Sequence, residues 1–290
     1  ARMRARPGFT HAWVYRIPGA RLRAWVDGAD RSPITPERVD LDLLDLPADA
    51  RYQGFEAIAF DGDRAALTVE RGLGDEMSAL LVTATLDPVR GLVLDRNATN
   101  LDVPLRSDNH SYEALTRVDN SWLALFEANG VSTSCASQAL RVGDTRAAPV
   151  VVSVEAIPYR LTDATAVDAD RRFWATQYSY RDVGDTAECE RTIRAVGCFS
   201  EAVDCDPRGG TARSVERLIE LRDDGVAVRP TGQVIRLLRE ARARNWEGIA
   251  RLDQRGFVMV TDEWPRTVLE FVPSPDRPLP TPAAPCPAVE

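Results

Sequence analysis

Four segments of this chain repeat one pattern of acidic, small and strand-forming residues. Each has an acidic residue followed by alanine or glycine, then a short alternating strand, then an aspartate five or six residues after the acid. A second strand, richer in aromatic and branched residues, completes each segment. The four segments are GFEAIAFDGDRAALTVE, SYEALTRVDNSWLALFEA, LTDATAVDADRRFWATQY and NWEGIARLDQRGFVMVTDE. Self-similarity of this kind is the sequence signature of a repeat architecture.

Each repeated segment has the character of a β-hairpin. Alternation gives the first strand one buried face, and Asp, Gly and Asn in the connection supply turn conformations. Further strand-like runs follow the hairpins: SALLVTATLD, APVVVSVEAI, SVERLIELR and TVLEFVP. Four strands per unit make one blade of a propeller. The sequence therefore predicts an all-β fold, a β-propeller of five blades, with four or six blades as the alternatives.

The organisation along the chain follows from this repeat. We expect one propeller domain over residues 1–272 and an extended, proline-rich tail over 273–290. The N-terminal strands carry no acidic hairpin motif, and we expect one of them to complete the last blade, which would remove exposed sheet edges. The interval between the third and fourth repeats is longer than one blade needs. We interpret its polar, cysteine-rich part, at about 181–213, as a loop insertion.

The cysteines of that insertion indicate a disulfide rather than a zinc site. Cys189, Cys198 and Cys205 lie in the stretch CERTIRAVGCFSEAVDC, which has no CxxC pair and no nearby histidine. A bridge between Cys189 and Cys198, or between Cys198 and Cys205, fits better. It implies an oxidising compartment, so we expect a secreted or periplasmic protein. The chain has five cysteines, so at least one thiol is left unpaired or intermolecular.

Charge and composition exclude several classes of function. The net charge of −8 argues against a nucleic-acid partner, because phosphate backbones require a cationic surface. The chain contains no lysine, which excludes a lysine Schiff base and a Walker-type phosphate loop. No apolar run approaches the roughly 20 residues that span a bilayer. None of these features indicates an oligomeric state.

The repeated acids are the candidate metal ligands. The innermost strands of a propeller surround its axis, so we expect Glu56, Glu113, Asp163 and Glu247 to face one central channel. Carboxylates brought together in this way repel one another unless they are protonated or bridged by a cation. Ca²⁺ accepts six to eight flexible oxygen ligands and suits such a ring better than Mg²⁺. The alternative is that these acids accept hydrogen bonds from backbone amides of neighbouring blades.

Five further residues are candidates for catalysis at the mouth of the channel: His110, Glu70, Arg71, Glu127 and Arg181. His110 lies in the loop DNHSYE and is a candidate general base or phosphate ligand, with a solvent-exposed loop histidine as the alternative. The other four end the second strands or lie in the loops after them. Arg71 and Arg181 could bind a phosphate or carboxylate bidentately, whereas surface ion pairs are their ordinary role.

The hairpins SYEALTRV and NWEGIARL resemble those of secreted calcium-dependent propeller hydrolases. The chain is similar to the phytase-like esterase propellers and, more distantly, to the calcium-activated nucleotidase (apyrase) family, whose five blades direct acids or serines towards a central calcium. The resemblance covers about residues 52–272 as a pattern of short hairpins. It implies calcium ligation by the four repeated acids, but no clear fifth ligand is present.

Two functions are compatible with these features. The first is a calcium-dependent hydrolase of a phosphoester, ester or lactone, with a small anionic or ester substrate bound over the metal. The second is a non-catalytic propeller with a structural metal, acting as a protein- or glycan-binding module. The fold does not decide between them, because one scaffold carries many functions.

Overall fold

The structure is a computed structural model of the chain, and it describes most of the hairpin repeats. The described residues are 11–42, 52–72, 76–104, 111–127, 138–144, 147–155, 157, 160–179, 215–237, 244–262 and 267–275. Within them the regular structure is β-strand apart from one helix, α1 (Gly19–Val26). The predicted all-β class is confirmed. The five cysteines, the core of the expected insertion and nearly all of the proline-rich tail lie outside the described residues.

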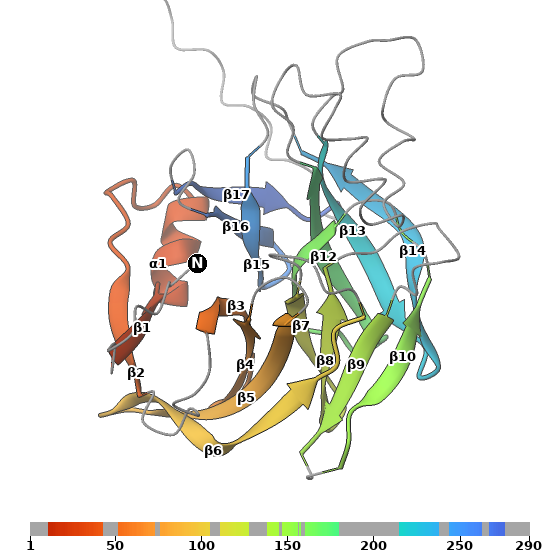
Figure 1. The fold of residues 1–290 in the computed structure, drawn as a ribbon. Helices are drawn as coiled ribbons and strands as arrows, with labels where there is room; N and C mark the ends of the chain where they lie inside the picture. The colour runs from red at the N-terminus through yellow and green to blue at the C-terminus, as the bar shows by residue number, and fades with distance from the viewer. Residues whose placement is uncertain are drawn as a thin grey trace, which may run out of the picture.

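The strands form four successive antiparallel meanders, which correspond to the four repeats (Figure 1). The first consists of β3 (Tyr52–Asp61), β4 (Arg64–Arg71), β5 (Ser78–Asp87) and β6 (Gly91–Leu101). The second consists of β7 (Tyr112–Val118), β8 (Ser121–Phe126), β9 (Gln138–Gly143) and β10 (Val150–Val154). The third consists of β11 (Arg160–Ala164), β12 (Arg172–Ser179), β13 (Val215–Asp223) and β14 (Ala227–Arg236). The fourth has three strands, β15 (Trp246–Leu252), β16 (Gly256–Thr261) and β17 (Leu269–Pro273).

The first strands of the meanders pack together in chain order. β3 contacts β7, β7 contacts β11, and β11 contacts β15. The meanders are therefore blades whose inner strands surround a common centre, as a propeller requires, and the four described blades lie within the predicted range of four to six. The second and third blades are joined again at their outer edges, where β10 pairs in parallel with β14. These two blades consequently curl around one shared apolar core.

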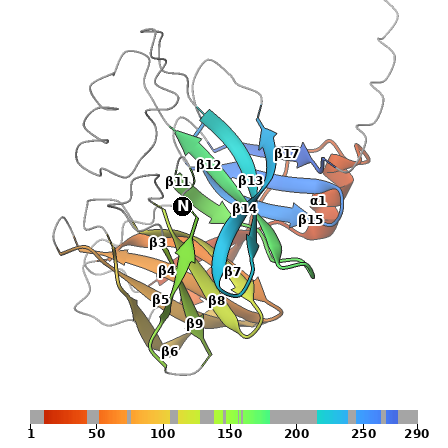
Figure 2. The same cartoon turned by 90° about the vertical axis from the view of Figure 1, so that its right-hand side faces the viewer.

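Residues 11–42 of the N-terminal segment connect the first blade to the fourth, and none of these described residues adds a strand to the fourth. β1 (His11–Arg16) pairs with β2 (Glu37–Asp42), and β2 pairs in parallel with β6 at the outer edge of the first blade. Arg255, in the turn between β15 and β16, donates hydrogen bonds of 3.1 and 3.0 Å to Asp27 at the end of α1, so α1 lies beside the fourth blade in Figures 1 and 2. The expectation that an N-terminal strand completes the last blade is wrong. The strand β2 extends the first blade instead, because it pairs in parallel with β6.

The turns and the blade interfaces explain why the repeats fold as hairpins. Asp119 and Asp253, two of the repeated aspartates, have φ values of 50° and 51°, the left-handed conformation that short hairpin turns need. Threonine hydroxyls link successive blades: Thr68 Oγ1 donates to the Tyr112 carbonyl at 2.7 Å, and Thr162 Oγ1 donates to the Trp246 carbonyl at 2.7 Å. These buried bonds fix successive blades against one another. No helix among the described residues is long and apolar enough to cross a membrane.

Candidate active site

Three of the repeated glutamates occupy the same irregularity in their inner strands. In β3, Phe55 and Ala57 pair with consecutive residues of β4, so Glu56 between them has no cross-strand partner. Glu113 has this position in β7, and Glu247 has it in β15. An extra residue of this kind is a β-bulge, which locally re-aims a side chain and is frequent beside functional sites. The repeat therefore places three carboxylates by one backbone device.

The third blade departs from this pattern. Its inner strand β11 shifts register between Leu161 and Asp163, so the bulged residue is Thr162 and the acid comes one position later. The Asp163 carboxylate accepts hydrogen bonds from the N–H of Ile249 at 2.7 Å and of Ala164 at 2.8 Å. Burial raises the pKa of Asp163 to about 7, against the opposing effect of these two N–H donors. Asp163 thus makes a backbone contact to the neighbouring blade, as the alternative interpretation of the acids expected.

The three bulge glutamates act on one another electrostatically. Burial raises the pKa of Glu113 well above its usual range, and the negative charges of Glu127, Glu56 and Glu247 raise it further. Burial also raises the pKa of Glu247 to about 7, with contributions from Asp262 and Glu56. Carboxylates influence one another in this way only when they are close in a medium of low dielectric constant. The bulges of three different blades therefore direct their acids to one region.

A fourth glutamate, an arginine and a tyrosine complete this cluster. Glu127, which follows β8, is fully buried, and one of its carboxylate oxygens lies 2.8 Å from Nη1 of Arg160. The Arg160 guanidinium lies 5.7 Å from the centre of the Tyr178 ring. Burial raises the pKa of Tyr178, and so do the charges of Glu113, Glu247 and Glu127, while Arg160 opposes them. We call Glu56, Glu113, Glu127, Glu247, Arg160 and Tyr178 the axial cluster.

The ends of the second strands also follow a structural repeat. In each blade, the residue just before the bulge pairs with a residue near the end of the second strand. The next residue of that second strand is Glu70 in the first blade and Glu127 in the second, and both stand fourteen residues after the bulged acid. In the third and fourth blades the equivalent residues are Tyr178 and Asp262, which stand fifteen residues after the acids Asp163 and Glu247. The difference arises because the hairpins of these two blades are longer between the bulge and the second strand.

The remaining predicted residues lie in different places. Glu70 is 3% exposed at the end of β4, in the position equivalent to Glu127. Arg71 donates hydrogen bonds of 3.2 Å to the side chains of Ser78 and Asn100, so it is engaged by the neighbouring strands of its own blade. His110 and Arg181 lie outside the described residues.

The oxygen atoms of the axial cluster are the kind of ligand that a hard cation binds. Apart from Arg160, the polar side-chain atoms of the cluster are all oxygens, and Arg160 is the one guanidinium that the described residues place beside its four carboxylates. Oxygen-rich, negatively charged sites are those that Ca²⁺ prefers. Within the described part of the chain, however, no three His, Cys, Asp or Glu side chains already stand as a set that could hold one metal ion. The cluster therefore supplies charge and ligands of the right kind, without a preformed coordination shell among these residues.

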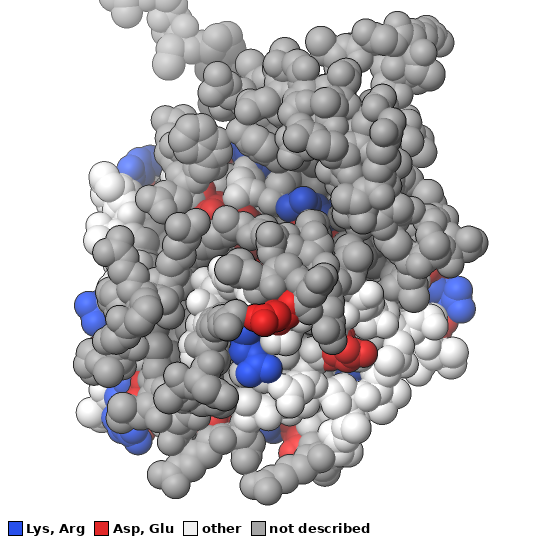
Figure 3. Space-filling view, in the orientation of Figure 1, with Lys and Arg blue, Asp and Glu red and all other residues white. Residues whose placement is uncertain are grey.

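Two members of the axial cluster were not predicted from the sequence. Arg160 is the first residue of the inner strand β11, three residues before the repeated acid Asp163, and that position was the available signal. Tyr178 could have been found only from the register of β11 and β12, in which it pairs with Arg160. Figure 3 shows acidic and basic side chains close together near the middle of the face seen in Figure 1.

Comparisons with known proteins give distant structural likenesses and no family. No protein-family model matches the chain, and no curated protein matches it. The α-L-arabinanase of Cellvibrio cellulosa covers 93% of this chain and 89% of its own at 10% identity, with a TM-score of 0.40. The same enzyme in complex with arabinohexaose covers 90% and 85% at 10% identity, with a TM-score of 0.38. A D477G ACO/RPE65 chimera covers 84% and 52% at 11% identity, with a TM-score of 0.31. The propeller assignment rests on the strand order and on the contacts between inner strands.

Proposed function

We propose that the chain is a calcium-dependent hydrolase of a phosphoester, ester or lactone, and that the axial cluster is its active site. The observation that supports this most directly is the convergence of Glu56, Glu113 and Glu247 from three equivalent bulges. A stable fold gains nothing from buried like charges, because each raises the cost of ionising the others. Perturbed carboxylates gathered from several elements are typical of functional sites.

Glu56, Glu113 and Glu247 are the residues that would hold the cation. Bound there, Ca²⁺ supplies Lewis-acid chemistry, polarising an oxygen of the substrate and stabilising the negative charge that develops on it. The raised pKa values of Glu113 and Glu247 mean that protons compete for the same oxygens. Cation binding near neutral pH should therefore release protons from this cluster.

Arg160 is the residue suited to bind an anionic part of the substrate. Its guanidinium is held by Glu127 at 2.8 Å and lies beside the Tyr178 ring, yet its side chain is 25% exposed. A guanidinium held in one orientation can present its remaining N–H groups to a phosphate or carboxylate. A carboxylate of the cluster that is not engaged by the cation can accept the proton of the attacking water.

The test is a substrate screen with the full chain in calcium and in chelator. We expect turnover of a nucleotide, phosphomonoester, aryl ester or lactone in calcium, and loss of that turnover in chelator. Calorimetry in two buffers of different ionisation enthalpy measures the proton release that accompanies calcium binding. Calcium binding without turnover of any substrate class would point to the binding module. The absence of calcium binding would overturn the proposed site itself.

Arg160→Gln tests the role of the arginine and distinguishes substrate classes. We expect kcat/KM for an anionic phosphoester to fall at least about tenfold, because a charge-assisted hydrogen bond to the substrate is lost. Turnover of a neutral lactone should change much less. Steady-state kinetics on both substrates measures the difference, with Arg236→Gln, an exposed arginine on β14, as the control. Equal losses on both substrates would mean that Arg160 only supports Glu127.

A further inference from the structure

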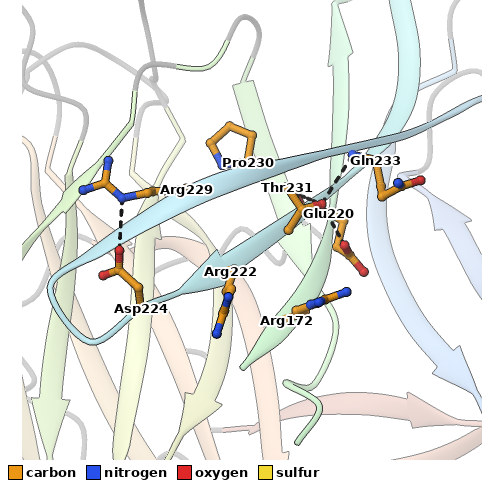
Figure 4. Close-up of a pocket in the computed structure, with 8 residues that line it drawn as sticks. All are labelled: Arg172, Glu220, Arg222, Asp224, Arg229, Pro230, Thr231 and Gln233. Atoms are coloured by element: carbon orange, nitrogen blue, oxygen red, sulfur yellow. Dashed lines mark hydrogen bonds and ion pairs between the residues drawn. The ribbon is translucent and has the colours of Figure 1, made fainter. Parts of the chain in front are cut away.

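A pocket of about 400 Å³ lies on the third blade, at the opposite end of β12 from the axial cluster. Arg172 begins β12 and Tyr178 stands near its end, six residues and roughly 20 Å away at the rise of a strand. Figure 4 shows the side chains that line the pocket, which come from β12, β13, β14 and the turn between β13 and β14. Its lining residues are Arg172, Glu220, Arg222, Asp224, Arg229, Pro230, Thr231 and Gln233.

Three of these arginines form a row across the blade. Arg172 on β12 pairs directly with Arg222 on β13, and Arg222 pairs directly with Arg229 on β14. Side chains of directly paired residues project from the same face of a sheet, within contact distance. Like charges in this arrangement destabilise a sheet unless something of opposite charge lies between them.

Among the described residues, the carboxylates of the pocket form an ion pair with only one of the three arginines, Arg229. Arg229 donates to Asp224 at 3.0 Å, as Figure 4 shows, and to Glu155 at 3.3 Å. Glu220, which is 8% exposed, accepts a hydrogen bond of 2.7 Å from the Thr231 hydroxyl.

Arg172 and Arg222 are the pair that remains. Among the residues that the structure describes, neither guanidinium has a hydrogen-bond or ion-pair partner, and Nε of Arg172 is a buried donor with none. Other arginines of this blade are paired: Arg171, next to Arg172 in sequence, contacts both Asp119 and Asp223. A buried donor without an acceptor costs free energy comparable to its lost hydration. An added acceptor beside Arg172 would satisfy this donor.

We propose that this pocket binds a tetrahedral oxyanion, a phosphate or sulfate group, between Arg172 and Arg222. A guanidinium presents a planar fork of donors that matches such a group, and two forks from adjacent strands supply the charge that a dianion needs. The group can be a free ion or the terminal group of a small ester, since the pocket is open to solvent at Arg222, Thr231 and Gln233. The site does not depend on the proposed hydrolase activity.

The experiment is a thermal-unfolding titration of the full chain with inorganic phosphate at constant ionic strength. Sodium sulfate and glycerol 2-phosphate form parallel arms that separate the free ion from the esterified group. Sodium chloride at matched ionic strength controls for screening. We expect a saturable rise in Tm with phosphate, and Arg222→Gln should need at least about tenfold more phosphate for the same rise. Arg172→Gln should behave in the same way, and Arg236→Gln should match the parent.

A structural role for the arginines predicts a different result. Without phosphate, Arg222→Gln should have a Tm equal to or above that of the parent, because a repulsion between like charges is removed. A lower Tm together with an unchanged phosphate response would overturn the proposal, and so would a parent whose response equals that of sodium chloride. The calcium-dependent rise in Tm of the axial site should persist in Arg222→Gln, which keeps the two proposals separable.

Discussion

Glu113→Gln should reduce calcium-dependent hydrolysis by at least about 100-fold, the effect typical of losing a group that acts at the reacting centre. The amide keeps the shape of the side chain but cannot carry the negative charge that a cation requires. The same change should stabilise the calcium-free protein above pH 7, because ionising Glu113 among Glu127, Glu56 and Glu247 is unfavourable. A loss of activity together with a gain in calcium-free stability would distinguish a functional carboxylate from one that supports the fold.

Assays of turnover and of thermal unfolding, each in calcium and in chelator, measure these effects. Glu37→Gln is the matched control, since Glu37 is an exposed glutamate on β2 that pairs with Arg16 at 2.8 Å. The control should match the parent in all four conditions. A Glu113→Gln protein that retains its calcium response would remove Glu113 from the site, and one that loses stability in chelator would show that its charge supports the fold.

The calcium-free protein should lose stability as the pH rises from about 4 to about 7. Asp163 and Glu247 each have a pKa of about 7 in the folded chain, above the values near 4 of unfolded carboxyls. A raised pKa means that the folded state binds more protons than the unfolded state across this window, so the free energy of unfolding falls as pH increases. The two shifts together come to about six pKa units, so at about 1.4 kcal/mol per unit the fall should be roughly 8 kcal/mol. The contribution of these two groups should level off above pH 7.

Urea unfolding at a series of pH values in chelator measures this fall. Asp163→Asn should flatten the curve, because an amide carries no titrating proton while its oxygen still accepts the Ile249 N–H. Groups such as Asp144 lie outside the window. Arg117 and Arg64 lower its pKa, so its contribution is lost only below about pH 4. Stability that is constant or increases from pH 4 to 7 would contradict the raised pKa values.

The sequence predicted the inner hairpins and three of the glutamates for a physical reason. In each repeat a carboxylate precedes a small residue at the same point of an alternating strand. We expect such a pattern to recur when the backbone has the same local conformation in every repeat. The bulges at Glu56, Glu113 and Glu247 are that backbone feature. The calcium, the secreted or periplasmic location and the disulfide remain predictions.

The sequence could not predict what depends on register between strands. Asp163 aligns with the glutamates in sequence, yet one residue of slippage makes Thr162 the bulged position and directs the aspartate to a backbone amide. Arg160 and Tyr178 become neighbours through the same pairing. Arg172 and Arg222 likewise face each other because of the alignment of β12 with β13, which the sequence alone does not fix across the long segment between these strands.

The parallel ladder between β10 and β14 has a consequence for how the chain is made. A strand usually finds its partner in the next few residues, but β10 must wait until β11, β12, β13 and everything between them have been synthesised. Forming a contact between residues so distant in sequence is slow, because the intervening chain loses conformational entropy before the hydrogen bonds of the ladder can offset that loss. During translation the second blade therefore emerges with the outer edge of β10 unpaired. That edge is covered only after β14 of the third blade has been synthesised.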